Sequence, residues 1–357
     1  MQLSKSPSDR IELLRFPLII SIVFIHSYDF QINFSGGSSV EYSPSQWVIY
    51  FMDAISQGFA RVAVPIFFLL SGFLFFLKFS ATFFCYKQKL ISRFHSLVFP
   101  FLFWNILVLA IFAIAQNISY TQSYFSGRML ISDFSTFDLI NAIIGLNQEP
   151  IAYQFWFIRD FIAVVLLTPA IYFLLKTFPF ITLLILKSIW FFNLWSIYIP
   201  SIDSLLFFYI GAFFAHKKID LFFSDIWGRF CFSVFLILVV LDTLSKGLSY
   251  NPEIHKLALI FGILGTLFIT KFFLDNKYLK DTLIYLGTTS FFVFATHEPL
   301  LITLKKLTFK LLPPASDFEL LGIFLLLPII TILICLAAYA LLNKIIPSLL
   351  LRMSGGR

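Results

Sequence analysis

Long apolar stretches recur along the chain, separated by short polar segments. A helix that crosses a bilayer needs about 20 mainly apolar residues. Ten stretches have this character, at residues 11–30, 60–79, 95–116, 153–175, 179–198, 203–216, 230–246, 257–274, 282–304 and 319–345. The pattern predicts an all-α, polytopic membrane protein with about ten transmembrane helices, forming one membrane-embedded domain over residues 1–357.

Two shorter apolar segments, 46–56 and 136–145, predict interfacial or re-entrant pieces within the longest connections, 31–59 and 117–152. The first apolar stretch has no small-residue cleavage site after it, so we expect a retained helix. The chain has no internal repeat, which weakens the hypothesis of a transporter built from inverted repeats.

Composition supports the membrane assignment. Of the 357 residues, 59% are hydrophobic and 13% are charged, whereas soluble domains carry roughly 25% charged residues. The mean hydropathy is +0.90. The net charge of +7 comes without a basic tract that would bind nucleic acid, so we expect no nucleic-acid partner. The three cysteines are far apart and predict neither a metal site nor a disulfide framework.

The distribution of basic residues predicts the orientation. If the N-terminus is cytoplasmic, 16 basic residues lie inside and 6 outside. The inside group is Lys5, Arg10, Lys78, Lys87, Lys89, Arg93, Lys176, Lys217, Lys218, Arg229, Lys271, Lys277, Lys280, Lys344, Arg352 and Arg357. The outside group is Arg128, Lys246, Lys256, Lys305, Lys306 and Lys310. Because cytoplasmic segments are enriched in Lys and Arg, both termini are predicted to be cytoplasmic.

The first apolar stretch carries polar side chains that suggest function. Arg15 and His26 are eleven positions apart, so on a helix they share one face and lie about 16 Å apart along its axis. Glu12, one turn before Arg15, can pair with it. Such a polar stripe indicates an internal passage; alternatively, Arg15 reaches lipid phosphates and His26 bonds a neighbouring helix.

This helix resembles that of membrane acyltransferase family 3, the polysaccharide O-acetyltransferases of bacterial envelopes. Glu12, Arg15 and His26 occupy the positions of the family's D-x-x-R…H motif, with Glu in place of Asp. Residues 60–76, ARVAVPIFFLLSGFLFF, are similar to the family's FFxLSGFL helix. In that segment Arg61 lies upstream and Ser71 lies in the Ser-Gly pair, which is also typical of helix packing.

Two later segments extend the resemblance. YQFWFIRDF, residues 153–161, is similar to the family's WFL helix entrance and contains Trp156 and Arg159. Gln154 stands where many members have His, so a proton-transfer role of that His does not carry over. TSFFVFATHEPLL, residues 289–301, resembles the family's H-x-P-L element and contains His297.

His26 and His297 are predicted to lie at the same depth, about 22 Å from the cytoplasmic edge. They either share a cavity or are two unrelated core histidines. The inner segment 86–101 has Arg93 at the first position of the family's Arg-x-x-Arg pattern, with Ser96 at the second, and Lys89 can supply the missing charge. The alternative is an ordinary basic inner loop.

The resemblance implies acyl transfer from acetyl-coenzyme A, or another acyl-coenzyme A, to a sugar hydroxyl of a lipid-linked or envelope glycan in the bacterial inner membrane. His26 would act as general base or as transient acyl carrier, with Arg15 and Glu12 beside it. Arg15, Arg93 and Lys89 would bind the donor's phosphates. The residues expected to line the cavity or hold the acceptor are Arg61, Ser71, Trp156, Arg159 and His297. No metal or bound cofactor is implied.

Two other functions fit part of the pattern. A glycan transporter or flippase would also have about ten helices and buried arginines, but it would not require the His-bearing first helix or the SGFL helix. A glycan polymerase would rely on a large, charged outer loop, and segments 31–59 and 117–152 are poor in charge.

Overall fold

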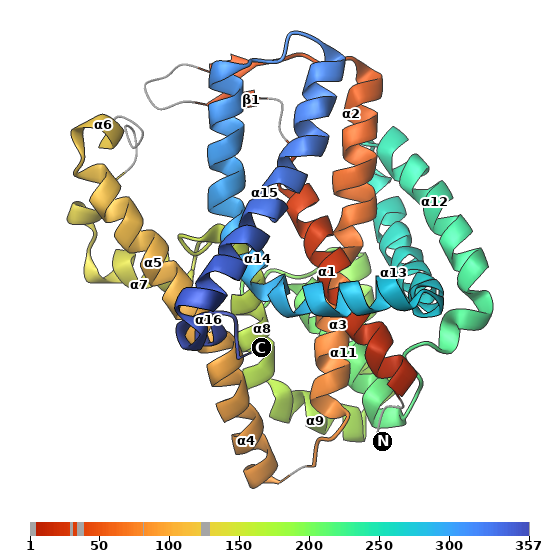
Figure 1. Ribbon diagram of the computed structural model, residues 1–357. Coiled ribbons are helices and arrows are strands. Elements are labelled where there is room, and N and C mark those ends of the chain that lie inside the picture. Colours follow the sequence, from red (N-terminus) through yellow and green to blue (C-terminus); the bar gives the residue numbers. More distant parts are fainter. Residues whose placement is uncertain (1–4, 29–30, 34–38, 81, 123–128, 357) are drawn as a thin grey trace. The chain divides into compact units, whose positions relative to one another are not determined.

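The computed structural model describes residues 5–28, 31–33, 39–80, 82–122 and 129–356 (Figure 1). These residues divide into two compact units whose segments alternate along the chain. Unit 1 is drawn from residues 1–25, 50–93 and 160–290, and unit 2 from residues 26–49, 94–159 and 291–357. The single domain expected over 1–357 stays a prediction.

The described elements of unit 1 are all helices or helical turns. Its elements are α1 (Lys5–Ile25), the π-helical η1 (Ala54–Phe59), the 3-10 turn η2 (Ala60–Val62), α3 (Ala63–Phe76), α4 (Phe83–Arg93), α9 (Thr168–Thr177), α10 (Pro179–Phe191), α11 (Ile202–Lys217), η7 (Phe223–Trp227), α12 (Gly228–Leu244) and α13 (Asn251–Asp275). Three helices contribute residues to both units, namely α2 (Gln46–Asp53), α8 (Trp156–Leu166) and α14 (Lys277–Leu311).

Unit 2 contains a small antiparallel hairpin as well as helices. Its elements are β1 (Gln31–Asn33), β2 (Ser39–Glu41), the π-helical η3 (Phe94–Val98), α5 (Phe99–Gln116), α6 (Ser119–Gln122), η5 (Ile131–Asp133), α7 (Thr136–Ile144), η6 (Tyr153–Phe155), α15 (Asp317–Ile345) and α16 (Pro347–Met353). In the hairpin Ile32 pairs with Val40. The sequence pattern did not predict these two strands.

Each of the ten predicted stretches contains helix in the structure, although the stretch 179–198 is helical only as far as Phe191. Among the described residues, five helices are long and apolar enough to cross a membrane, or six if the pair 153–166 and 168–177, bent by 57°, counts as one span. The helical, membrane-spanning class is therefore confirmed. The number of ten spans and the cytoplasmic position of both termini stay predictions.

The structure corrects two expected boundaries. Segment 46–56 is not a separate piece, because α2, η1, η2 and α3 form one helical run of 31 residues from Gln46 to Phe76. The reason is that Val48 and Met52, four positions apart, are both fully buried on one helical face. The expected connection 31–59 is therefore helical from Gln46 onward. Residues 34–38 and 123–128, including Arg128 of the orientation count, lie outside the described residues.

The core of unit 1 contains a close crossing of α3 and α11. A Cβ atom added at Gly72 would overlap the carbonyl oxygen of Phe208, and one added at Gly211 would overlap that of Leu69. The two backbones therefore touch where both sequences carry glycine, as small residues allow in membrane helices. The Ser-Gly pair of the SGFL segment thus lies at a helix-packing contact.

The α12–α13 hairpin packs on the middle of the 31-residue run (Figure 1). A Cβ atom at Gly58 would lie 2.7 Å from Val239 Cγ1, and one at Gly262 would lie 2.6 Å from Val62 Cγ1. These close approaches place Val239 of α12 beside η1 and Gly262 of α13 beside η2.

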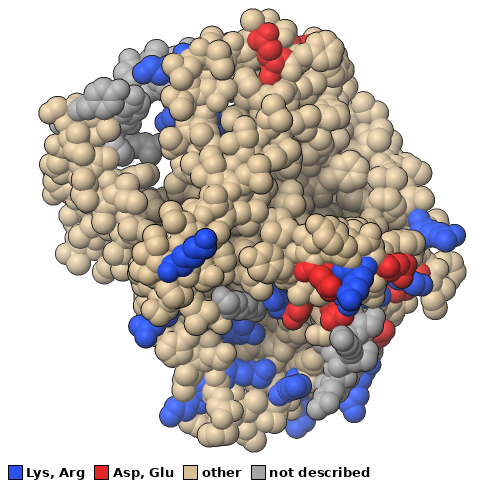
Figure 2. All heavy atoms as spheres, in the orientation of Figure 1, with Lys and Arg blue, Asp and Glu red and all other residues tan. Residues whose placement is uncertain are grey.

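The surface is dominated by uncharged residues. On the face shown in Figure 2, large areas carry no Lys, Arg, Asp or Glu. Exposed apolar side chains include those of Phe180, Leu184 and Ile185 on α10 and of Ile237 and Leu241 on α12. Contiguous apolar surface of this kind is what contact with lipid requires.

Candidate active site

His26 is the first residue after α1, not part of it. The predicted helix 11–30 is therefore too long at its C-terminal end. The spacing of about 16 Å predicted between Arg15 and His26 assumed that one helix carries both residues, whereas His26 lies just beyond the end of α1. Two buried side chains satisfy the backbone here: Ser56 Oγ donates to the Phe24 carbonyl (2.7 Å), and Lys305 Nζ donates to the His26 carbonyl (2.7 Å). Carbonyl groups at a helix end need such partners, so these contacts fix where the chain leaves the helix.

Tyr153 reaches His26 from the 3-10 turn η6. The turn is held by its flanking residues: the Ala152 N–H donates to Asn105 Oδ1 (3.1 Å), and the fully buried Phe155 packs against Phe101 and Phe294. The Tyr153 side chain is 40% exposed. A rigid turn therefore presents a hydroxyl group from a partly open position.

The wall opposite η6 is the part of α14 that precedes Pro299. Proline has no N–H and cannot bond the carbonyl of the residue four positions earlier, which is Ala295. Gln154 Nε2 donates to this oxygen (3.1 Å). Gln154, at the position where many members of the resembled family have His, therefore joins η6 to α14 and gives His297 and Glu298 a fixed place beside Tyr153.

His26, Tyr153 and Glu298 form a hydrogen-bonded chain within unit 2. His26 Nδ1 lies 3.1 Å from Tyr153 Oη, and Tyr153 Oη donates to Glu298 Oε1. A carboxylate only accepts, so the tyrosine proton points to Glu298 and its oxygen accepts from Nδ1–H of His26. In this arrangement the neutral His26 ring carries its lone pair on Nε2.

His297 lies directly beside His26, with ring centroids 5.5 Å apart. It is fully buried, and its Nδ1 donates to the carbonyls of Phe294 (2.7 Å) and Val293 (3.2 Å). Backbone carbonyls only accept, so Nδ1 carries the proton. Its Nε2 has no hydrogen-bond partner among the described residues. The expected proximity of the two histidines is confirmed, and their chemical roles stay predictions.

A family model described as an acyltransferase domain matches residues 8–342. The chain belongs to this acyltransferase family. The succinoglycan biosynthesis protein ExoH of Rhizobium meliloti (strain 1021) is 24% identical over 367 residues, covering 98% of this chain and 92% of that protein. No solved structure matches the chain. Together with the apolar helices, the family identifies a multi-pass membrane O-acyltransferase.

Membership in this acyltransferase family removes support from the other two functions considered. A transporter or a polymerase would not require an acyltransferase domain across nearly the whole chain. The motif residues that suggested the family can therefore be placed in the structure as parts of an acyltransferase.

Glu12 and Arg15 lie on α1 against Gly287 of α14, both within unit 1. A Cβ atom at Gly287 would lie 3.3 Å from the Glu12 carbonyl oxygen and 3.8 Å from Arg15 Cβ. Both side chains are half-buried. The two motif residues of the first helix thus lie at a helix contact formed by the start of α14.

Two other predicted residues have structural partners in unit 2. Arg159 Nη1 donates to the carbonyls of Gly145 (2.8 Å) and Gln148 (3.2 Å) and lies 3.7 Å from Glu149 Oε2. It therefore clamps the turn after α7. Trp156 begins α8, two residues after Gln154, so it extends the rigid segment that carries Tyr153.

The remaining predicted residues lie in unit 1. Lys89 Nζ donates to the Phe75 carbonyl (2.6 Å) at the end of α3, and Arg93 lies over the Phe161 ring, 5.9 Å from its centroid. Arg61 donates to Gln57 Oε1 through Nε (2.8 Å) and Nη2 (2.5 Å). Ser71 is half-buried beside the α3–α11 crossing.

Sequence reasoning missed Tyr153, Glu298 and Lys305. For Glu298 a signal was present: it is a carboxylate within the otherwise apolar stretch 282–304, where an ionisable group needs a partner. That rule was applied only to basic residues inside predicted helices. Lys305 was counted as an outer-loop charge, but its side chain is buried within the length of α14. Tyr153 carried no signal among the 14 tyrosines of the chain.

Proposed function

We propose that this protein transfers an acyl group, most simply acetyl, from acyl-coenzyme A to a sugar hydroxyl of a cell-envelope polysaccharide. The observation that carries the proposal is the pair of adjacent imidazoles, His26 and His297, each with its Nδ1 engaged. The polysaccharide acceptor is supported by the relative named for the biosynthesis of succinoglycan, a polysaccharide. The family resemblance points to the inner membrane of a bacterium.

The chemistry assigned to His26 is general-base catalysis. A sugar hydroxyl is a poor nucleophile until its proton is removed, and neutral imidazole suits that task near pH 7. As the hydroxyl oxygen attacks the thioester carbonyl carbon, Nε2 of His26 takes the hydroxyl proton. The C–S bond then breaks, and the imidazolium returns the proton to the leaving sulfur, which gives the acyl ester and free coenzyme A.

Tyr153 and Glu298 support this role through the other ring nitrogen. Their hydrogen-bonded chain holds Nδ1 as a donor and therefore keeps the lone pair on Nε2. A buried carboxylate at the end of the chain also stabilises the imidazolium that forms during transfer, as in other base–orienter pairs. His297, with its open Nε2, is placed to accept a hydrogen bond from the acceptor hydroxyl or its neighbour.

We assign the binding of the acyl donor to cationic side chains of unit 1. Arg15, Arg93 and Lys89 remain the proposed partners for the phosphates of coenzyme A, because charge-assisted hydrogen bonds to phosphate are strong. Lys89 and Arg93 are four residues apart on α4 and therefore share one helix face. Nε2 of His26, the nitrogen that carries the lone pair, can alternatively attack the thioester and carry the acyl group.

The test measures release of coenzyme A from acetyl-coenzyme A by the protein in membranes, with and without a glycolipid extract as acceptor. The wild type, His26→Ala and a matched control, His216→Ala, are compared at equal folded amounts. Loss of general-base catalysis costs about 10²–10⁴-fold, so His26→Ala should lose acceptor-dependent release by that factor while His216→Ala keeps it.

Rapid denaturation at neutral pH during turnover, which avoids the acid hydrolysis of an acyl-imidazole, separates the two roles of His26. Labelled acyl-protein that is absent from His26→Ala indicates a carrier, and its absence from the wild type indicates a base. Wild-type protein that neither binds acyl-coenzyme A nor releases coenzyme A with any glycan extract would contradict the proposed donor. Undiminished release by His26→Ala would contradict the proposed site.

A further inference from the structure

The 31-residue helical run changes its hydrogen-bond pattern directly after Asp53. The α-helix α2 ends at Asp53, and the π-helical η1 and the 3-10 turn η2 follow before α3 resumes the α pattern. A π segment inserted in a helix is rare and is frequently found at functional sites. This irregularity lies in unit 1, and apart from Ser56, which bonds the Phe24 carbonyl at the end of α1, its side chains have no part in the proposed chemistry of His26.

The Asp53 side chain is buried without a hydrogen-bond donor. Asp53 is 6% exposed, and its carboxylate does not cap η1 and accepts no hydrogen bond from the residues that the structure describes. A largely buried carboxylate that lacks donors is unfavourable. A ligand that brings hydroxyl groups would supply the missing donors.

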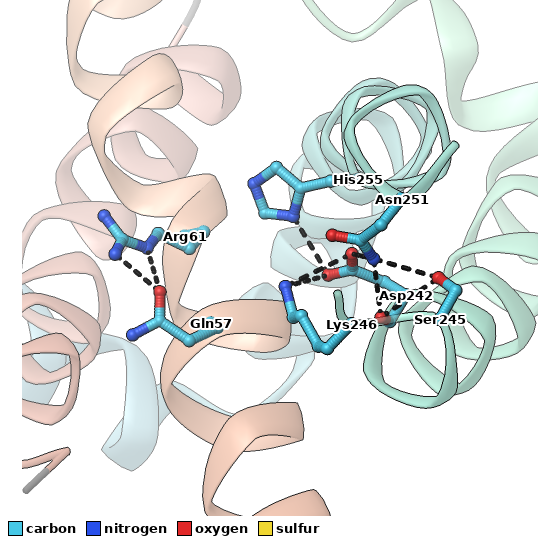
Figure 3. Close-up of polar contacts among 7 residues, drawn as sticks. All are labelled: Gln57, Arg61, Asp242, Ser245, Lys246, Asn251 and His255. Atoms are coloured by element: carbon cyan, nitrogen blue, oxygen red, sulfur yellow. Dashed lines mark hydrogen bonds and ion pairs between the residues drawn. The ribbon is translucent and has the colours of Figure 1, made fainter. Parts of the chain in front are cut away.

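Charged groups of the α12–α13 hairpin lie within electrostatic reach of this carboxylate. Lys246, Asp242 and His255 interact electrostatically with Asp53, as does Arg61. Asp242 is fully engaged within the hairpin: it accepts from His255 Nδ1 (2.9 Å), Asn251 Nδ2 (2.8 Å) and Lys246 Nζ (3.3 Å) (Figure 3). Asp242 therefore acts as a positioning residue that sets the direction of the histidine and the lysine.

Two side chains of the hairpin, His255 and Lys246, face the helical run that contains η1 and η2. His255 and Lys246 point from the hairpin toward the helix that carries Gln57 and Arg61 (Figure 3). Because His255 Nδ1 is committed to Asp242, Nε2 is the nitrogen available to a ligand. The side chains of His255 and Lys246 are 26% and 36% exposed. The cluster thus offers a carboxylate and an imidazole nitrogen as acceptors and an ammonium as donor.

We propose that Asp53, Lys246 and His255 form a subsite that binds a neutral sugar ring of the acceptor glycan. Sugar hydroxyls both donate and accept hydrogen bonds, which matches a mixed set of acceptors and a donor. Because Lys246 and Arg61 balance the charges of Asp53 and Asp242, the cluster has no net positive charge that would favour a phosphate or a carboxylate ligand. Under the predicted orientation the 247–256 connection is on the outer side, where a polysaccharide acceptor would be met.

The subsite rests on the proposed function for its biological meaning, but its binding is measured without turnover. The protein is placed in nanodiscs free of glycolipid and of glucoside or maltoside detergents, whose head groups are sugars. Saturation-transfer NMR then tests methyl β-D-glucopyranoside, methyl β-D-galactopyranoside and, as the anionic comparison, D-glucuronate. We expect at least one neutral glycoside to bind more tightly than glucuronate.

Asp53→Asn and His255→Gln are the matched variants, with Asp275→Asn, an exposed aspartate at the end of α13, as the control. Hydrogen bonds to a charged group are worth about 1.5–3 kcal/mol, so Asp53→Asn should weaken glycoside binding about tenfold or more. If Asp53→Asn does not fold, His255→Gln and Lys246→Met carry the test. Binding by the control should equal that of the wild type.

Kinetics separate this inference from the proposed function. If the subsite is correct, Asp53→Asn and His255→Gln raise the KM for the glycan acceptor and leave the KM for acyl-coenzyme A unchanged. Acyl transfer with unaltered acceptor KM in both variants overturns the subsite and leaves the proposed function standing. Wild-type protein that binds none of the glycosides also overturns the subsite. Glycoside binding without any acyl transfer supports the subsite and contradicts the proposed function.

Discussion

Two buried polar clusters, one around Arg10 in unit 1 and one around His26 in unit 2, differ in what they leave unsatisfied. Arg10 donates to Asp225 through Nη1 (2.6 Å) and Nη2 (2.9 Å), and to Thr270 Oγ1 through Nε (2.8 Å). It also donates to the Leu267 carbonyl (2.7 Å) and covers the Phe222 ring, 3.6 Å from its centroid. Every nitrogen of the guanidinium has a partner.

The His26 cluster is held as firmly but is not saturated. Its two imidazoles each have Nδ1 engaged, and His297 Nε2 has no partner among the described residues. A saturated cluster stabilises a fold, whereas a reactive group must be oriented through one atom and available through another. If burial and charge were the only criteria, Arg10 would be a stronger candidate for a functional residue than His26. The unpartnered Nε2 of His297 is what distinguishes the candidate site from the structural cluster around Arg10.

Breaking the Arg10 cluster should give the largest effect on stability. Removing one partner of a buried ion pair typically costs about 3–5 kcal/mol, and the loss of Arg10 also removes its bonds to Thr270 and the Leu267 carbonyl, although Asp225, 24% exposed, regains part of its hydration. Arg10→Met should therefore lower the thermal unfolding midpoint in nanodiscs strongly, while the fraction that remains folded keeps the wild-type KM values. A loss of turnover without a fall in the midpoint would show that Arg10 contributes to chemistry.

Breaking the Tyr153–Glu298 chain should have the opposite effect, lowering activity while leaving stability nearly unchanged. Tyr153→Phe and Glu298→Gln remove the orienting contacts of His26 and keep side-chain shape, so we expect kcat to fall about 10–100-fold. Acceptor KM and the unfolding midpoint should change little. Because the residues act as one unit, the double variant should be scarcely worse than the worse single variant. Additive losses in the double variant would contradict a shared chain.

The smallest effect is expected at an exposed contact, the N-terminus of α7. There Ser135 Oγ accepts from the Asp138 N–H, and Asp138 accepts from Ser135 in return. These hydrogen bonds, the side-chain one first, lower the pKa of the Asp138 carboxyl. The capping contribution is therefore present at neutral pH and is lost as the pH falls through the lowered pKa.

Asp138→Asn should speed amide hydrogen exchange in α7 at neutral pH, since the capping box is broken. Compared with wild type at the same pH, the difference should vanish in acid, where the wild-type carboxyl is protonated too. Asp133→Asn in η5 is the control and should leave α7 unchanged. A difference that persists in acid would show that the asparagine acts by another route.

The sequence was sufficient for the helices and for the family. Apolar stretches of spanning length predicted all ten helical regions, because burial in lipid or in the core demands a local run of apolar residues. The boundaries were less certain: α1 ends at Ile25 rather than at residue 30, and Gln46 already belongs to the helix that contains Ser71. The first error arises where distant side chains, Ser56 and Lys305, satisfy the last carbonyls, and the second where the fold buries Val48 and Met52 on one helical face.

The candidate site also contains residues that the sequence predicted and residues that it did not. The first-helix motif and the 289–301 element pointed to His26 and His297, because their residue types and spacing are visible in one dimension. Tyr153, Glu298 and Lys305 became visible only when the chain folded, since their contacts span 127, 145 and 279 positions in the sequence. Hydropathy is a property of neighbouring residues and was fixed by the sequence alone. Which polar atoms are satisfied and which are left open depends on long-range contacts, and only the tertiary structure decided it.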